Sequence, residues 1–283
     1  MEKIPVRTIS EPEFSERFII RDVEELLSGM DMVQELHRHN FFFVLVLKKG
    51  EGEHSIDFNS YPVKDCTVFF MRPGQVHQLK LKRDSVGFLI QFNADFYSSV
   101  AKPSGQVLRK VSNKSHYKFS PDKFEKLMAI LSDIFLEHNE KQDKYKETIR
   151  ANLDVFFIHL LRQSQGAEIR KKATNSYAQE RLEDLMTLLE THIITCKEVG
   201  KYADMMHLTA YQLNAITKET LGKTCSQLIN EQIILEAKRN LLATTSQVNE
   251  IAHDLGYEDA SYFTRFFKRH MGFSPESYRQ NFK

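Results

Sequence analysis

The sequence has few cysteines, and no pairing pattern connects them. Cys66, Cys196 and Cys225 are the only three, and they form no CxxC or other ligand spacing. Neither a disulfide framework nor a cysteine-based zinc site is indicated, and a reducing cytosol fits this usage. No apolar run approaches the roughly 18 residues that span a bilayer, and no apolar segment follows a basic start. We expect a cytoplasmic protein without a membrane partner.

An excess of positive charge is also missing. The 283 residues carry a formal charge of +1, and from Tyr177 onward 12 Lys and Arg stand against 14 Asp and Glu, a balance of −2. Because a nucleic-acid-binding domain is usually basic, contact with DNA would depend on local positive charge. The cations expected to supply it are Lys238, Arg239, Arg265, Lys268, Arg269 and Arg279. The length and the 41% hydrophobic content support two domains, each with its own core.

A helical unit near the C-terminus occurs twice, the copies about fifty residues apart. In the second copy, residues 248–252 open a short helix, Gly256 can take the positive φ of a turn, and residues 260–270 form another helix. Ser274 and Pro275 then begin a last helix. The helix over 260–270 has a polar face and an aromatic face. The polar face holds Ser261, Thr264, Arg265, Lys268 and Arg269, and the aromatic face holds Tyr262, Phe263, Phe266, Phe267 and His270.

The first copy repeats this frame around a helix over residues 209–221. Its apolar side holds Leu213 and Ile216, and the opposite side holds Tyr211, Asn214, Ala215 and Lys218. Between the copies, residues 225–242 contain no Gly or Pro and predict one helix, roughly 27 Å long. Two helix-turn-helix units are therefore predicted, with recognition helices about 34 Å apart, one turn of B-DNA.

The second copy resembles the DNA-binding domain of the AraC/XylS transcription regulators. The matching segments are Gly256-Tyr257, residues 261–269, residues 272–275 and Tyr278-Arg279, within a resemblance over residues 180–282. It implies a sequence-specific transcription regulator that binds double-stranded DNA, with RNA polymerase as a candidate partner. The first copy departs from the family's pattern. Residues 215–218 read Ala-Ile-Thr-Lys where the family commonly has Arg, an apolar residue and Phe-Lys.

Both recognition helices supply candidate DNA contacts. Among them, Arg265 is expected to bind guanine, Asn214 to bind adenine, and Lys268 to contact phosphate. The full set of DNA-binding candidates is Thr209, Tyr211, Gln212, Asn214, Lys218, Ser261, Tyr262, Thr264, Arg265, Lys268 and Arg269.

The N-terminal half predicts many short strands. Residues 41–47 form a continuous apolar run rich in β-formers, and residues 53–58 alternate apolar and polar side chains. Close, regular spacing of such strands favours a sandwich or small barrel. The pair His37 and His39, with residues 73–77 (PGQVH), resembles the cupin signature and is similar to the effector-binding domain of the same regulator family.

This second resemblance implies that a small-molecule effector binds in the barrel. The candidate pocket residues are His37, His39, Phe42, Val44, Phe70, Arg72 and His77. We expect no catalytic residue, no cofactor and no metal. Metal-using cupins generally place a Glu three to four residues beyond the histidine pair, where Phe43 and Val44 stand here. Glu35 is expected on the same strand face as the two histidines, but it precedes them where metal-using cupins have a Glu that follows. A transition-metal site also needs three or four convergent donors.

From Ser120 onward the pattern becomes helical. Two amphipathic helices are predicted, one after Ser120 and one from about Tyr145 to Leu161, and helices of this kind mediate homodimerisation in such regulators. We predict an α+β chain with a cupin-like β-barrel and trailing helices over residues 1–165, the helices at about 121–162. A linker over 166–176 contains a solvated basic triplet at 170–172, and an all-α double helix-turn-helix domain covers 177–283.

Two other interpretations are also compatible with the sequence. The chain could be a metal-dependent cupin enzyme with a DNA-binding appendage. It could also be a ligand-independent regulator whose barrel only dimerises.

Overall fold

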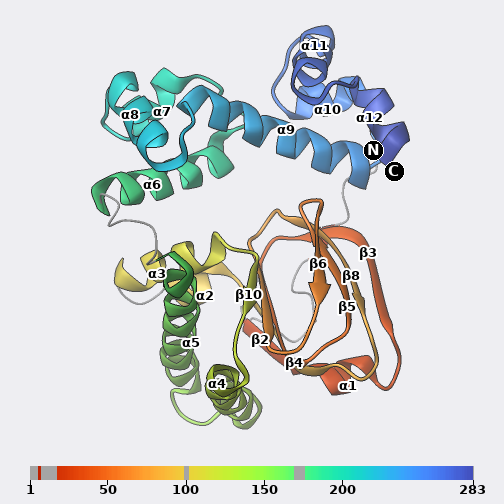
Figure 1. Cartoon of the computed structure of the whole chain (residues 1–283), viewed down its shortest axis with the longest axis vertical. Helices are drawn as coiled ribbons and strands as arrows, with labels where there is room; N and C mark the ends of the chain where they lie inside the picture. The colour runs from red at the N-terminus through yellow and green to blue at the C-terminus, as the bar shows by residue number, and fades with distance from the viewer. Residues whose placement is uncertain (1–5, 8–17, 99–101, 169–175, 283) are drawn as a thin grey trace. The chain divides into compact units, whose positions relative to one another are not determined.

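The computed structural model describes residues 6–7, 18–98, 102–168 and 176–282. These residues form two compact units, the first ending with helix α5 and the second beginning with helix α6 (Figure 1). The basic triplet at 170–172, in the expected linker, lies outside the described residues. None of the described helices is long and apolar enough to cross a membrane.

The first unit is built on two five-stranded sheets that share an apolar interior. Neighbouring strands are antiparallel except for β1 and β3. The first sheet has the order β1 (Val6–Arg7), β3 (Met32–His39), β8 (Val76–Leu81), β5 (Gly52–Ile56) and β6 (Asn59–Val63). The second has the order β10 (His116–Lys118), β7 (Thr67–Met71), β4 (Phe42–Lys49), β9 (Val86–Phe92) and β2 (Phe18–Asp22). The predicted β fold of this half is confirmed.

Residues 42–47 of strand β4 are all apolar, and both faces of this part of the strand are buried. Phe43 and Leu45 pack between the two sheets, while Val44 and Val46 pack against helices on the outer side of the second sheet. Helices α4 and α5 lie along this side of the strands (Figure 1). The helices of this unit are α1 (Val23–Leu27), α2 (Ala94–Ser98), α3 (Lys102–Ser112), α4 (Pro121–Glu140) and α5 (Tyr145–Glu168). Helix α5 continues past its expected end at Leu161 into the segment expected to be linker.

A β-bulge in β3 decides which of its side chains face the interior. The register against β8 shifts between Gln34 and His37, so that two residues on β3, at 35 and 36, lie opposite one residue on β8, at 78. An extra residue re-aims the side chains that follow it. His37 and His39 are buried, whereas Glu35 is exposed. The prediction that Glu35 shares a face with the two histidines is therefore wrong.

The second unit consists of helices packed around one apolar core. They are α6 (Ser176–His192), α7 (Val199–Met205), α8 (Ala210–Leu221), α9 (Cys225–Ala243), α10 (Val248–Asp254), α11 (Ala260–Met271) and α12 (Pro275–Phe282). Helices α7 and α8 form one helix-turn-helix unit and α10 and α11 the other, toward opposite ends of α9 (Figure 1). Both units place predicted apolar residues in the core, Leu213 from α8 and Phe263 from α11. The predicted double helix-turn-helix fold is confirmed.

Candidate nucleic-acid interface

Helix α11 buries one face and exposes the other. Phe263, Phe266 and Phe267 are buried in the core of the second unit. The exposed residues are Ser261, Tyr262, Arg265, Lys268 and Arg269, with Thr264 partly buried. Tyr262 is 56% exposed, although its periodicity placed it on the aromatic core face. Its ring therefore joins the exposed polar side chains as a candidate DNA contact.

Among the described residues, the Arg265 guanidinium has a weak ionic partner in Asp259. Its Nη2 lies 4.0 Å from Asp259 Oδ2, and the two side chains are 72% and 61% exposed. An exposed ion pair at this distance contributes about 0–1 kcal/mol. The other oxygen of Asp259 accepts a hydrogen bond from the Ser261 backbone N–H at 2.7 Å, which caps α11. This geometry leaves Arg265 able to contact a base.

Positive charge on this helix is local. Lys268 and Arg269 lie in the last turn of α11 and are exposed, as Arg265 is. Three cations thus project from one helix of a region whose overall charge is −2. Clustered cations of this kind can neutralise DNA phosphates.

Helix α8 exposes a different surface. Tyr211 is 84% exposed, and Ala215 and Lys218 are exposed beside it. Lys218 is the only cation in the sequence of α8. The first recognition helix therefore offers an aromatic and apolar surface with a single positive charge, whereas the second offers three.

Three predicted DNA contacts of the first unit make hydrogen bonds within the protein. Asn214 Oδ1 accepts from the Cys225 N–H at 3.0 Å, and Asn214 Nδ2 donates to the Ala210 carbonyl at 3.0 Å. A bidentate contact with adenine needs both of these groups, so the geometry argues against the predicted role of Asn214. Thr209 and Gln212 form a capping box at the start of α8.

Two arginines that were expected to supply surface charge instead bind groups within the second unit. Arg239 is 6% exposed and forms an ion pair with Glu236. Arg279 donates to the carbonyls of Leu241 and Ser246 at 3.0 and 2.6 Å. Arg279 therefore ties α12 to the end of α9 and to the segment that follows it. The sequence could not show this, because the carbonyls are more than thirty residues away.

The turn of the second helix-turn-helix unit, at Gly256, packs against the segment after α6, at Ile194 and Lys197. Gly256 has a φ of 73°, and a Cβ atom at this residue would lie 2.2 Å from the Ile194 carbonyl oxygen. Lys197 Nζ donates to the carbonyls of Ile194 and Gly256 at 3.0 and 3.1 Å. Burial lowers the pKa of Lys197 below its ordinary value. This contact fixes where α11 begins relative to α6.

The residues predicted to form the effector pocket do not come together. Phe42, Val44 and Phe70 pack with the helices on the outer side of the second sheet. The side chains that alternate with them, Phe43 and Phe69, face the interior between the sheets. The sequence did not separate these two sets, because β4 and β7 are buried on both faces.

The remaining pocket candidates are also divided. His37, His39 and His77 are buried and adjacent to one another. The Arg72 guanidinium instead donates to Asn113 Oδ1 at 3.2 Å, at an exposed place beyond the end of β7. Sequence reasoning missed His54 of β5, which hydrogen-bonds to His77. Burial, then the charges of neighbouring histidines, lowers the pKa of His54 to about 3, so its imidazole is neutral at neutral pH.

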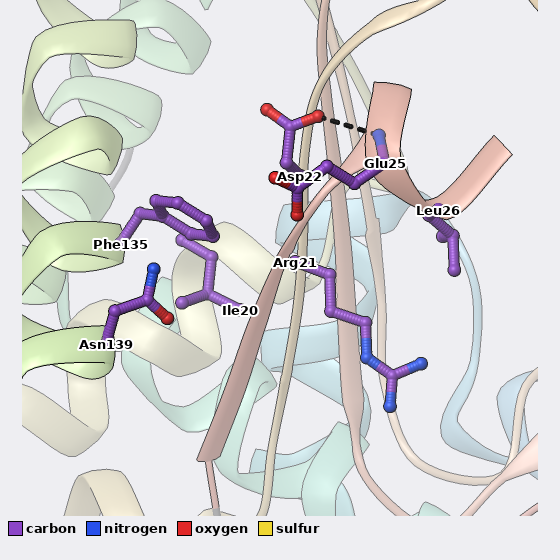
Figure 2. Close-up of a pocket in the computed structure, with 7 residues that line it drawn as sticks. All are labelled: Ile20, Arg21, Asp22, Glu25, Leu26, Phe135 and Asn139. Carbon is purple, nitrogen blue, oxygen red and sulfur yellow. Dashed lines mark hydrogen bonds between the residues drawn. The ribbon is translucent and has the colours of Figure 1, made fainter. Parts of the chain in front are cut away.

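A pocket of about 430 Å³ lies between β2, α1 and α4 (Figure 2). Its lining residues are Ile20, Arg21, Asp22, Glu25, Leu26, Phe135 and Asn139. Asp22 Oδ1 accepts from the Glu25 N–H at 3.1 Å and so caps α1 within the pocket wall. The volume is in the range of small-molecule sites, and the lining mixes charged, amide and apolar groups.

Two family profiles match the chain. One, described as an AraC-like ligand binding domain, matches residues 25–189, and one described as a helix-turn-helix domain matches residues 202–281. The HTH-type transcriptional activators RhaS of Yersinia pseudotuberculosis and Yersinia pestis are each 24% identical to this chain over 246 residues. The matches cover 86% of this chain and 88% of each relative.

Solved structures show weaker likeness. ToxT from Vibrio cholerae O395 matches 93% of this chain and 97% of its own at 13% identity and a TM-score of 0.41. The C-terminal domain of the response regulator yesN from Fusobacterium nucleatum matches 35% of this chain and 98% of its own. Its identity is 24% and its TM-score 0.34.

Proposed function

The chain belongs to the AraC family of transcription regulators, and we propose that it binds two successive major grooves of one DNA duplex with α8 and α11. The observation that carries this proposal is the construction of the second unit. Its two helix-turn-helix units share one core, and a single 19-residue helix, α9, lies between them. Such a helix is about 28 Å long, close to the 34–36 Å between successive major grooves once the flanking helices are added.

The two recognition helices are assigned different tasks. Helix α11 supplies Arg265 for a base edge and Lys268 and Arg269 for phosphates, because these three cations are exposed on one helix. Helix α8 supplies Tyr211 and Ala215, which offer apolar contact to a thymine methyl group, and Lys218 for a phosphate. Most of the electrostatic attraction therefore comes from the second unit.

The N-terminal unit is the ligand-binding domain of the family, and we propose that it binds a small-molecule effector that changes the affinity for DNA. The pocket beside β2 and α4 has a suitable volume.

Homodimerisation is proposed through α4 and α5, which expose the apolar side chains Leu136, Val155 and Ile158. We propose regulation rather than catalysis, since RhaS is a transcriptional activator. We propose that the protein acts in the cytoplasm, with RNA polymerase as a further partner.

Affinity for DNA should depend on salt with a moderate slope. The exposed cations of α8 and α11, with helix N-termini, make about three to five phosphate contacts per chain, and each contributes about −0.9 to the slope of log K against log salt. A slope of about −3 to −4.5 per chain is expected. Fluorescence anisotropy with a labelled duplex over a series of KCl concentrations measures it. A slope near zero would contradict phosphate binding and hence the proposed interface.

A further inference from the structure

The pocket between β2, α1 and α4 has one apolar wall. Ile20 of β2 is 3% exposed and belongs to the core that the second sheet shares with its helices, and Phe135 of α4 packs against the same core. Both side chains line the pocket (Figure 2). The volume of about 430 Å³ is enough for a small organic molecule, and the wall favours one with an apolar body.

The charged groups of the lining are divided by strand β2. Successive residues of a strand point to opposite faces, so Arg21 leaves β2 on the face opposite to Ile20. Figure 2 accordingly shows the Arg21 guanidinium on the side of β2 away from Phe135. It shows the carboxyl groups of Asp22 and Glu25 on the side toward Phe135. The part of the pocket that faces α4 therefore combines negative charge with an aromatic ring.

This negative charge has no cationic partner within residues 18–98, 102–168 and 176–282. Asp22 Oδ1 accepts two backbone N–H groups in the first turn of α1, at 2.7 and 3.1 Å, and neither it nor the Glu25 carboxylate forms an ion pair in these ranges. Asn139 lies in the last turn of α4, where helix carbonyls carry partial negative charge. The basic residue of that turn, His138, has its ring 5.8 Å from the Phe18 ring, between centroids.

These groups are those that recognise an organic ammonium ion. A carboxylate accepts strong, charge-assisted hydrogen bonds from an ammonium group, and the face of a phenyl ring attracts a cation. The Asn139 amide oxygen is a further acceptor. A carboxylate or phosphate ligand would instead approach two side chains of its own charge, which is unfavourable.

We propose that this pocket binds an organic cation with an apolar body, such as an alkyl- or arylalkylammonium ion. Its ammonium group donates to the carboxylates of Asp22 and Glu25, and its body lies along Phe135 and Ile20. This inference rests on the proposed function, because it names the chemical class of the effector.

The first test measures the binding of matched probes to the full chain by isothermal titration calorimetry. The probes are 2-phenylethylamine, a cation at neutral pH, with neutral 2-phenylethanol and anionic phenylacetate. Hexylamine, hexanol and hexanoate form a second series with a linear body. Ligands of this size bind with dissociation constants of about 0.1–10 mM. We expect one amine per chain, bound at least about tenfold more tightly than its alcohol. Absence of amine binding in both series, or equal binding of an amine and its carboxylate counterpart, would overturn the proposal.

Two variants on α1 test the position of the charge. Glu25→Gln and Glu24→Gln each remove one negative charge, but only Glu25 lines the pocket. Glu25→Gln should weaken amine binding by about 5- to 20-fold and leave alcohol binding unchanged. Glu24→Gln, the matched control, should bind as the unaltered chain does. Equal amine affinities of the two variants would place the cation outside this pocket and overturn the proposal.

A third variant tests the ring. Phe135→Leu keeps an apolar side chain but removes the phenyl face, so it should weaken amine binding by about two- to fivefold and change alcohol binding less. An equal loss for the amine and the alcohol would show that Phe135 contributes apolar contact alone and would contradict the proposed contact with the cation.

Affinity for a selected DNA duplex, measured by fluorescence anisotropy, distinguishes this inference from the proposed function. At an amine concentration that saturates Glu24→Gln but not Glu25→Gln, the affinity of Glu24→Gln for DNA should change and that of Glu25→Gln should not. An amine that binds the pocket without changing DNA affinity would contradict the effector role and leave the pocket assignment standing. Salt-dependent DNA binding by a chain that binds no amine would overturn the pocket assignment and leave the DNA-binding function standing.

Discussion

Replacing Gly256 with Ala is expected to destabilise the second unit by more than about 3 kcal/mol and to abolish DNA binding. The new Cβ would lie 2.2 Å from the Ile194 carbonyl oxygen, in a backbone conformation with φ of 73° that L-residues rarely adopt. To relieve the contact, the turn must move away from the segment after α6, and Lys197 would lose the two carbonyls that it joins. Urea unfolding followed by circular dichroism measures the loss.

Gly272 offers a matched control for this substitution. Its φ is 80°, but a Cβ added there meets nothing within 4 Å. Gly272→Ala therefore incurs only the backbone cost of the left-handed region, about 1–2 kcal/mol. Equal losses of stability in the two variants would show that the contact with Ile194 does not hold the turn.

Replacing Arg265 with Ala should relax sequence preference at one base pair in one half of the binding site. A bidentate contact between Arg and guanine contributes about 1–3 kcal/mol of discrimination, and the weak contact with Asp259 leaves the guanidinium able to make it. Selection of sites from a random pool, followed by affinity measurements on single-base variants, provides the test. We expect one position of the selected motif to lose its information while the remaining positions keep theirs.

Lys268→Ala is the comparison variant on the same helix. Because Lys268 is expected to contact phosphate, Lys268→Ala should weaken binding to all DNA sequences about equally. It should also reduce the magnitude of the salt slope by about one. If Arg265→Ala selects the same motif as the unaltered chain, with equal information in both halves, then Arg265 does not read a base.

The order of elements was accessible from the sequence because local patterns determine it. The spacing of Phe263, Phe266 and Phe267 predicts both helix α11 and its buried face, and Ser274 with Pro275 predicts where α12 begins. Short apolar runs predict the strands of the first unit in the same way. Both family resemblances stated for the sequence agree with the profiles that match it.

Long-range contacts were not accessible in this way. The bulge between Gln34 and His37 depends on pairing with β8, and only that pairing shows that Glu35 faces outward. Asn214 looks like a base-reading residue on α8 until the Cys225 N–H is placed against it. His54 joins the histidine cluster because β5 is the neighbour of β8, which local periodicity does not reveal.

One chain is expected to reach two successive major grooves of the DNA. Residues 176–283 contain the whole described core of the second unit, so this fragment should fold alone and bind DNA that the full chain binds. Hydroxyl-radical footprinting of the fragment on a selected site is the most direct measurement. We predict two protected stretches on one face of the duplex, their centres about 10–10.5 base pairs apart. A single protected stretch, or a helical fragment that leaves no footprint on this DNA, would contradict the account.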